Sequence, residues 1–489
     1  MAVMGSSGSG KTTLLNVLTN RNLDNFKVSG QVTVNGVVVG ENIGNISAYV
    51  QQDDLFVGIL TVREHLWFNA LLRMDQRLTD SERNARVDEV MMDLSLTKCE
   101  NSAIGEPGKV KSISGGERKR LSFATEILTN PKILFCDEPT SGLDSFMAEN
   151  VVQHLRKMAM DMKKIVVCTI HQPSSEIFKL FDHLTLLSEG QLVFQGPVND
   201  AKQFFAQNGF LCPNEYNPAD FLIRTVAIVP NLQIECKEKV ELLAHSFKTS
   251  EMGRELSRKI SEVENNRDHI SNVVNSNPSR ANFFRQFRCL AWRSVTANYR
   301  DVMFVRVRLF QNIFIALFIG LVFFGQQNNQ KAVQNINGCL FLFCTNMAFS
   351  NAFGVILTFT SGLPLFKREH QNGTYGTSVY FLCRQLADLP LFIINPIIFV
   401  SVCSSFSFLF TVQMGVFSSF QITYWMVGLN PDPYSFLICC AVAILLTNSV
   451  VSWGYFLSSA CAKGDTASVL VGPLTMPFIM FGGFLLNDA

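Results

Sequence analysis

A glycine-rich run near the start constrains this chain more than any other feature. It reads Gly5-Ser6-Ser7-Gly8-Ser9-Gly10-Lys11-Thr12. Its glycines let the backbone turn so tightly that N–H groups point inward at phosphate oxygens. Lys11 supplies a positive charge for the β- and γ-phosphates, and the Thr12 hydroxyl is placed to bind Mg²⁺. A helix over residues 13–18, starting at Thr13, would add its dipole to the site. The run therefore predicts a strand, a phosphate loop and a helix that together bind a nucleoside triphosphate.

A second constraint is an acidic pair that follows a short apolar stretch. Residues 133–136 are apolar and lead directly into Asp137 and Glu138, a pattern typical of a buried parallel strand that ends in charge. Asp137 would hold Mg²⁺ through water, and Glu138 would polarise the attacking water as general base. The two motifs together predict an α/β fold that hydrolyses a nucleotide.

Between them lies the run Ile113-Ser114-Gly115-Gly116-Glu117. In this order, the three motifs resemble those of the ATP-binding-cassette (ABC) proteins, which implies ATP and Mg²⁺ as cofactors. The resemblance also implies that Ser114, Gly115 and Gly116 close over the γ-phosphate held by another cassette. The chain contains no second phosphate loop or signature. The resemblance therefore implies a dimer of half-transporters.

Further site residues follow from the same resemblance. Gln52 would contact Mg²⁺ and the attacking water, with Gln51 as the alternative. Residues 139–144 resemble the loop that crosses to the partner cassette, and they end at Asp144. His171 follows the apolar stretch 165–169 and resembles the switch residue that touches the γ-phosphate.

Charge is distributed unevenly along the chain. The net charge of +1 gives no sign of a nucleic-acid surface, whereas 48% of the residues are hydrophobic. Residues 301–489 hold long stretches with almost no charge, as expected of a membrane part in the lipid bilayer. Segments of spanning length lie at about 307–325, 338–362, 389–410, 434–458 and 467–486. Basic residues flank them in the pattern that places the N-terminus in the cytosol.

The order of cassette first and membrane part second, with Asn217-Pro218-Ala219-Asp220-Phe221, resembles the G subfamily of ABC transporters and, within it, the White-type eye-pigment half-transporters. The implied fold is an α/β P-loop ATPase cassette, with an antiparallel β part and a helical subdomain, followed by an all-α polytopic transmembrane domain. We assign 1–225 to the cassette, 226–281 to a polar linker and 282–489 to the membrane domain, which opens with an amphipathic helix.

The same resemblance implies an ATPase coupled to transport of a small apolar or amphipathic cargo, such as a lipid, sterol or pigment precursor. The membrane would be the plasma membrane or that of an intracellular vesicle. Homodimer and heterodimer both remain open. We expect a coupling helix within 368–389, where Glu369 and Tyr375 would contact the cassette.

Some features depart from the family pattern. Residues 401–421 interrupt the resemblance and suggest a retained intron or an added span. We also expect the first strand, the adenine-stacking region and the last part of the membrane domain to be incomplete. A non-functional truncated fragment is therefore one alternative interpretation, and a soluble ABC ATPase without spans is another.

Overall fold

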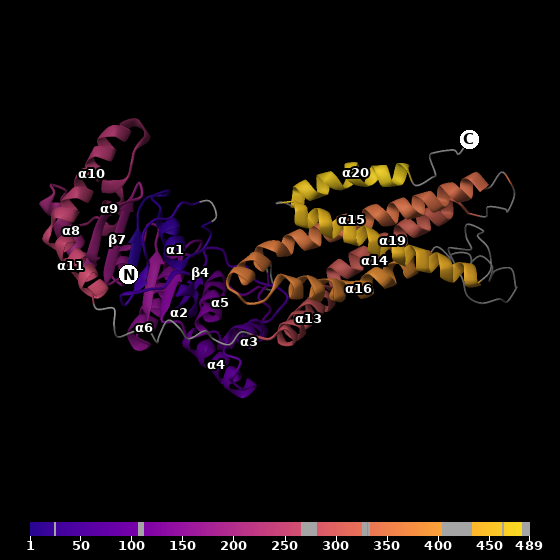
Figure 1. The fold of residues 1–489 in the computed structure, drawn as a ribbon, viewed down its shortest axis with the longest axis horizontal. Coiled ribbons are helices and arrows are strands. Elements are labelled where there is room, and N and C mark those ends of the chain that lie inside the picture. The colour runs from indigo at the N-terminus through magenta and orange to yellow at the C-terminus, as the bar shows by residue number, and fades with distance from the viewer. Residues whose placement is uncertain are drawn as a thin grey trace. The chain divides into compact units, whose positions relative to one another are not determined.

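The computed structural model of the chain describes residues 1–23, 26–105, 112–265, 281–324, 330, 333–402, 433–461 and 464–481. These residues form two compact units, Met1–Asn282 and Phe283–Ala489. The first combines strands with helices, and the described part of the second is helical (Figure 1). The expected fold class, an α/β cassette followed by a helical domain, is confirmed. Most of the interruption at 401–421, from residue 403 onward, lies outside the described residues.

A six-stranded sheet forms the centre of the first unit, with the order β4-β5-β6-β1-β7-β8. The strands are β1 (Ala2–Met4), β4 (Ser47–Val50), β5 (Ile133–Cys136), β6 (Ile165–Thr169), β7 (His183–Ser188) and β8 (Gln191–Pro197). Neighbouring strands from β4 to β7 run parallel, and β8 pairs antiparallel with β7. A separate antiparallel hairpin joins β2 (Thr33–Val34) and β3 (Val37–Val38).

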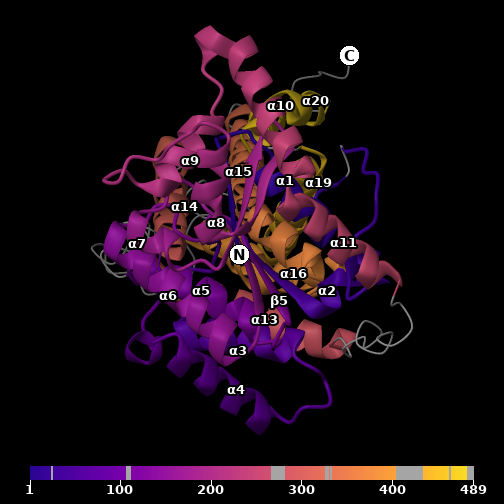
Figure 2. The ribbon, with the colours of Figure 1, turned by 90° about the vertical axis from the view of Figure 1, so that its left-hand side faces the viewer.

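Helices surround this sheet, and several begin at well-defined caps. They are α1 (Lys11–Thr19), α2 (Ile43–Ile46), α3 (Val62–Arg73), α4 (Asp80–Asp93), α5 (Gly115–Ile127), α6 (Ser145–Asp161), α7 (Ser175–Phe178), α8 (Val198–Gln207), α9 (Pro218–Val226), α10 (Gln233–Thr249) and α11 (Glu251–Asn265). Thr61, Thr79 and Ser114 each cap a helix through a reciprocal bond with the glutamate three residues on. Helices α3 and α4 pack together (Figure 2).

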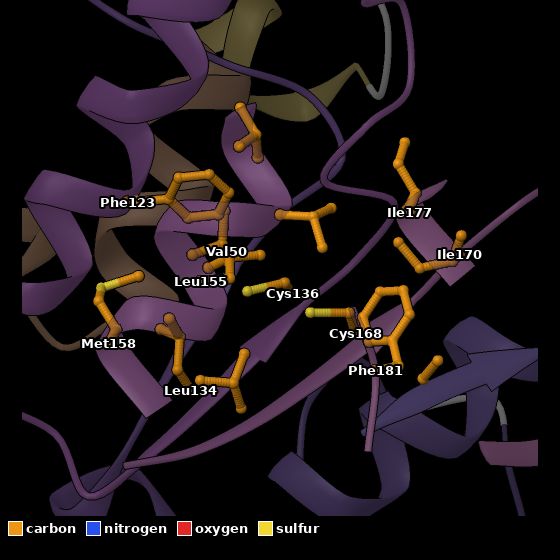
Figure 3. Packing of buried hydrophobic residues seen from close by; sticks show 14 of the residues in the cluster. Val50, Phe123, Leu134, Cys136, Leu155, Met158, Cys168, Ile170, Ile177 and Phe181 are labelled. Carbon is orange, nitrogen blue, oxygen red and sulfur yellow. The ribbon is translucent and has the colours of Figure 1, made fainter. Parts of the chain in front are cut away.

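The apolar core fixes the position of the acidic pair. All four residues of β5 are buried. Val50 of β4, Phe123 of α5 and Leu155 of α6 pack around Cys136 (Figure 3). Because apolar side chains cover both faces of β5, the strand is held firmly along its length. The residues that follow its last apolar position therefore emerge at a defined place on the sheet edge.

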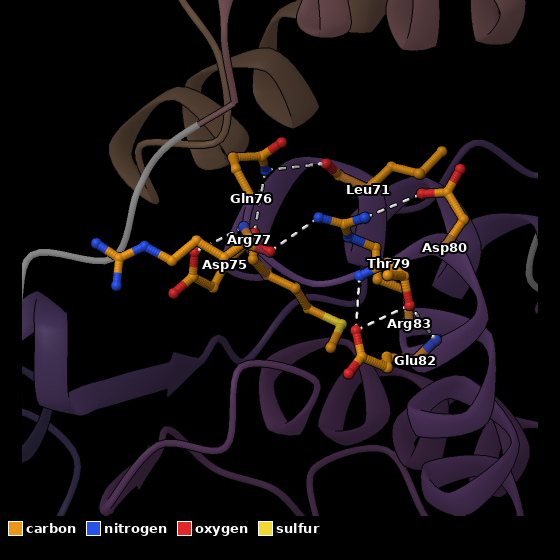
Figure 4. A network of polar contacts seen from close by, with 9 residues as sticks. Leu71, Asp75, Gln76, Arg77, Thr79, Asp80, Glu82 and Arg83 are labelled. Atoms are coloured by element: carbon orange, nitrogen blue, oxygen red, sulfur yellow. Dashed lines mark hydrogen bonds and ion pairs between the residues drawn. The ribbon is translucent and has the colours of Figure 1, made fainter.

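A polar network holds the start of α4. Arg83 is 1% exposed. Its guanidinium donates to Asp80 Oδ1 at 2.9 Å and to the Asp75 carbonyl at 2.8 Å (Figure 4). The arginine thus satisfies a backbone acceptor just before the helix and a carboxylate in its first turn, which fixes the turn before α4 to the helix itself.

The second unit consists, in its described part, of long helices. They are α13 (Phe283–Arg300), α14 (Val302–Val322), α15 (Val333–Gln371), α16 (Thr377–Val402), α19 (Pro433–Ala460) and α20 (Gly464–Met480). Among the described residues, Val333–Gln371, Thr377–Ile397 and Pro433–Ala460 are long and apolar enough to cross a membrane, and Leu309–Val322 is a shorter apolar helix. The expected segment at 338–362 lies within the longer α15, because polar residues continue the helix beyond its apolar stretch, and the segment expected at 389–410 starts inside α16. The ends of the segments expected at 389–410 and 467–486 lie outside the described residues.

The connection between α15 and α16 differs from the expectation. Helix α15 runs to Gln371 and α16 begins at Thr377, so residues 368–389 contain the ends of two long helices and a short turn instead of a separate coupling helix. Glu369 and Tyr375 are buried, and both bind Arg293 of α13 within this unit. The buried cation needs these partners, which is why the two side chains point inward.

Candidate functional site

The carboxyl ends of four parallel strands bring the predicted site residues to one edge of the sheet. The phosphate loop follows β1, Gln52 follows β4, Asp137 and Glu138 follow β5, and His171 follows β6. Parallel strands place the residues after them on the same side, which is where ligands bind in open α/β sheets. Residues far apart in the sequence can therefore meet here.

The phosphate loop turns tightly between β1 and α1. Gly10 has a φ of +95°, in the left-handed region. A Cβ on Gly5 would lie 2.3 Å from the Leu187 carbonyl oxygen, so this position requires glycine. The Lys11 ammonium donates to the carbonyl oxygens of Gly5 and Ser6, each at 3.0 Å. Burial lowers the pKa of Lys11, while Glu138 and Asp137 oppose that shift. The loop thus holds a partly desolvated cation beside two carboxylates.

The remaining loop residues differ in exposure. Ser9 is buried, whereas Ser7 is exposed. At the start of α1, Thr12 and Thr13 are exposed as well. Helix α1 begins at Lys11 without a side-chain cap. An uncapped helix N-terminus offers its N–H groups to an anion.

Asp137 accepts hydrogen bonds from three hydroxyl groups. Its Oδ1 accepts from Thr12 at 3.2 Å and from Thr169 at 2.7 Å, and its Oδ2 accepts from Tyr49 at 3.1 Å. Burial, together with the nearby Asp137, raises the pKa of Tyr49 well above its usual value, so this hydroxyl stays protonated and donates. The carboxylate is therefore fixed between the phosphate loop, β4 and β6.

Glu138 and Gln52 contact each other directly. The Gln52 amide donates to Glu138 Oε2 at 2.9 Å. Glu138 has a φ of +44°, and its backbone N–H donates to the Thr169 hydroxyl at 2.8 Å. Lys119 of α5 donates to the Gln52 carbonyl oxygen at 2.9 Å. The Gln51 carbonyl oxygen accepts from the same ammonium at 3.4 Å. Of the two glutamines, Gln52 is the one whose side chain binds the acidic pair.

A cavity of about 320 Å³ lies beside Glu138. Glu138 and His171 both line it, together with Gly142 and Leu143 of the loop after the acidic pair. His171 is exposed. Asp144 caps α6, since its Oδ1 accepts from the Met147 N–H at 2.9 Å. Glu138, His171 and the loop after the acidic pair therefore line one open space.

The signature residues form the start of another helix. Ser114 caps α5, and its hydroxyl donates to Glu117 Oε2 at 2.9 Å. Gly115 and Gly116 are the first helical residues, and a Cβ on Gly116 would lie 3.0 Å from Met147 Sδ. Within the part of the chain that the structure describes, no hydrogen bond joins Ser114, Gly115 or Gly116 to the phosphate loop. The chain thus brings together its own phosphate loop, acidic pair and Gln52, but not its signature.

The donors at this edge fit a magnesium ion. Thr12 and Asp137 lie within hydrogen-bond distance, and the Gln52 side chain reaches the adjacent Glu138. Hydroxyl, carboxylate and amide oxygens are hard ligands, the class that Mg²⁺ prefers.

Three residues of the site were not predicted from the sequence: Tyr49, Lys119 and Thr169. Each lies next to a predicted residue or motif, but its partner comes from a different strand or helix. Tyr49 and Thr169 are near the ends of strands that flank β5. The sequence pattern that could have indicated Tyr49 and Thr169 is a polar residue at the end of an apolar strand. That pattern identifies a partner for Asp137 only when the order of the strands is known.

Comparisons with known proteins match both units. A sequence profile of the ABC transporter family matches residues 1–141, and profiles of ABC-2 type transporters match residues 285–420, 404–488 and 171–245. The chain is 44% identical to Protein white of Drosophila melanogaster over 491 residues, which cover 100% of this chain and 68% of that protein. It is 36% identical to Protein scarlet of the same species, covering 100% of this chain and 71% of that protein.

A mammalian relative and a solved structure complete the comparison. The chain is 32% identical to the broad substrate specificity ATP-binding cassette transporter ABCG2 of Bos taurus, covering 99% of this chain and 74% of that protein. A dimeric bacterial ABC transporter cassette aligns with 40% of this chain and 84% of its own, with 25% identity and a TM-score of 0.34.

Proposed function

The chain belongs to the G-type ABC half-transporters that include Protein white, and we propose the roles of its site residues, its assembly and its class of cargo. The family is one of ATP-hydrolysing membrane transporters of small molecules. The ABC-2 type membrane domain and the apolar helices of the second unit argue against the alternative of a soluble ATPase.

One observation carries the proposed site: two hydrogen bonds connect three separate sequence motifs. Thr12 of the phosphate loop binds Asp137, and Gln52 binds Glu138. In our proposal, residues 5–13 hold the triphosphate, with Lys11 against its β- and γ-phosphates. Glu138 accepts a proton from the attacking water, and Gln52 and His171 orient that water and the γ-phosphate.

Thr12, Asp137 and Gln52 would hold Mg²⁺. When bound, the ion neutralises charge that develops on the β- and γ-phosphate oxygens. The hydroxyls of Tyr49 and Thr169 keep Asp137 in place, and Lys119 keeps the backbone at Gln52 in place. The chain's own contribution is therefore to fix oxygen donors before ATP arrives.

We further propose that the working unit contains two half-transporters. Ser114, Gly115 and Gly116 lack hydrogen bonds to the phosphate loop of their own chain, within the described residues. A signature supplied by a second half-transporter, whether a copy of this chain or a different one, would complete the site. Asp144, at the start of α6, would lie where the two cassettes meet.

The cargo that we propose is a small apolar or amphipathic molecule such as a lipid, a sterol or a pigment precursor. Helices α15, α16 and α19 support it, because the apolar stretches that make them long enough to cross a membrane carry few charges that could bind a strongly polar cargo. We propose the plasma membrane or an intracellular vesicle membrane as the location, with the first unit in the cytosol.

Substitution of Lys11 tests the site. In lipid vesicles containing the protein, Lys11→Ala should weaken ATP binding by about tenfold or more, because the phosphates lose a charge-assisted partner. ATP-driven uptake of a labelled sterol should then fall to background. Lys157→Ala removes an exposed lysine of α6 and should change neither quantity. Unchanged ATP binding in Lys11→Ala would show that the triphosphate binds elsewhere.

A further inference from the structure

The Thr169 hydroxyl connects both acidic residues of the site to the neighbouring strand. Thr169 is the last residue of β6 and is completely buried. Its Oγ1 donates to Asp137 Oδ1 at 2.7 Å and accepts from the Glu138 N–H at 2.8 Å. A hydroxyl has one donor and two acceptor positions, so it makes both bonds at once. The register of the two strands, with Cys136 opposite Cys168, places Thr169 directly beside the turn into the acidic pair.

The bond to Glu138 supports an uncommon backbone conformation. Glu138 has a φ of +44°, which residues with a side chain adopt infrequently. In this conformation the Glu138 carboxylate accepts from the Gln52 amide at 2.9 Å. The Thr169 hydroxyl satisfies the Glu138 N–H in this turn. Without it, a partly buried donor would lose its partner, and we expect the turn to relax toward a more ordinary conformation.

The bond to Asp137 differs from the other two hydroxyl contacts of that carboxylate. Thr12 is an exposed residue, and its hydroxyl is the group that we propose as a Mg²⁺ ligand. Tyr49 holds only Oδ2. Thr169 therefore remains to orient Oδ1 when Thr12 turns to the metal.

We propose that Thr169 is a positioning residue for Asp137 and Glu138, setting the metal-facing carboxylate and the general base with one hydroxyl. The inference rests on the proposed function of those two residues. Thr169 itself does not touch ATP or the water. Its removal should therefore affect turnover and the metal dependence much more than the binding of ATP without metal.

Two substitutions of Thr169 separate the hydroxyl from the shape of the side chain. Thr169→Val keeps the branched shape and removes the hydroxyl, and it should lower kcat for ATP hydrolysis by about tenfold or more, because the base is misplaced. ATP affinity measured without Mg²⁺ should stay within about twofold, since the phosphate loop is intact, whereas the gain in affinity on adding Mg²⁺ should shrink. Thr169→Ser retains the hydroxyl and should keep kcat within about threefold.

The same sheet offers a matched control. Thr185 lies on β7, is 3% exposed, and its hydroxyl has no hydrogen-bond partner among the described residues. Thr185→Val makes the same chemical change in a buried strand and should leave kcat and the Mg²⁺ effect unaltered. If thermal unfolding shows that Thr169→Val does not fold, Thr169→Ala is measured instead. The same changes in kcat and in the Mg²⁺ effect are expected of it.

Several results would overturn the inference: normal turnover in the folded Thr169→Val or Thr169→Ala protein, an equal loss in Thr185→Val, or a loss in Thr169→Ser as large as that in Thr169→Val. The Lys11→Ala variant separates this inference from the proposed function. If Lys11→Ala still binds and hydrolyses ATP, the proposed site itself is wrong. If Lys11→Ala is inactive and Thr169→Val is normal, only the role of Thr169 is wrong.

Discussion

Two buried lysines of the cassette, Lys119 and Lys164, differ in the hydrogen-bond partners of their ammonium groups. The Lys119 side chain is 2% exposed, and its ammonium contacts three oxygens, the Gln51 and Gln52 carbonyls and Asp54 Oδ1. Lys164 is 8% exposed, and its ammonium has no hydrogen-bond partner among the described residues. Burial, aided by Arg86 and Lys132, lowers the pKa of Lys164 to about 8. The oxygens around Lys119 thus bind its ammonium directly, whereas Glu89 and Asp93 only partly offset the effects of burial and nearby cations on Lys164.

Replacement of Lys164 should therefore stabilise the cassette. Below pH 8, Lys164 is charged in both the folded and the unfolded state, and folding moves that charge out of water, which costs free energy. That cost declines between about pH 8 and the unfolded pKa of 10.5, above which the lysine is neutral in both states. We expect Lys164→Met to raise the free energy of unfolding at pH 7 by about 1 kcal/mol, after allowance for nearby solvent.

Thermal unfolding at a series of pH values measures this effect. The melting temperature of Lys164→Met should exceed that of the parent at pH 7, and the difference should shrink as the pH rises toward 10. The exposed Lys157→Met serves as control and should show no such gain. A gain that grows with pH would contradict the assigned cause.

At the residue scale, sequence spacing predicted residues that belong to continuous motifs, but it did not predict the residues that hold them in place. Lys11, Asp137 and Glu138 follow from local patterns, because each motif is continuous in the chain. Tyr49 and Thr169 bind Asp137 only because β4 and β6 lie on either side of β5. That strand order is set by packing over the whole unit, and no local pattern encodes it.

Among the elements, two helices with the same type of N-terminal cap can be compared directly. Helices α4 and α5 begin with the same arrangement, in which Thr79 and Ser114 each exchange hydrogen bonds with a glutamate three residues later. Loss of either hydroxyl should lower the free energy of unfolding by about 1 kcal/mol. Only Ser114 is also proposed to bind the γ-phosphate held by a second cassette.

Ser114→Ala and Thr79→Ala should therefore have similar melting temperatures and different activities. We expect Ser114→Ala to lower ATP hydrolysis by about tenfold, because it removes a hydrogen bond to a charged group, and Thr79→Ala to leave it unchanged. ATPase assays of both variants in lipid vesicles make the comparison. An equal loss in the two variants would indicate that helix capping alone explains the role of Ser114.

The sequence predicted that the second unit contains apolar helices, but it did not predict where those helices begin and end. Apolar length indicated spans at 338–362 and 389–410, yet α15 covers Val333–Gln371 and α16 covers Thr377–Val402. A helix continues wherever its backbone bonds are satisfied, so its ends do not coincide with the ends of an apolar stretch. Arg293 shows the same point, since its bonds to Glu369 and Tyr375 hold polar helix ends inside the unit.

In the whole molecule, one chain joins a nucleotide-hydrolysing unit to a membrane unit. The phosphate loop, acidic pair and Gln52 come together within the first unit, whereas the signature starts a different helix. In our proposal, a site divided in this way is completed by the signature of a second half-transporter. ATP would then act as the contact between two cassettes, and its hydrolysis would release that contact.

The Glu138→Gln variant, assayed with ATP and Mg²⁺ in lipid vesicles, tests this account most directly. The amide keeps the size of the side chain but cannot accept the proton, so we expect hydrolysis to fall by about hundredfold or more. ATP should stay bound to the variant. After treatment with a chemical cross-linker, a larger fraction of the variant than of the parent should be recovered as covalently linked cassette pairs. Hydrolysis at the parent rate, or loss of bound ATP together with hydrolysis, would contradict the account.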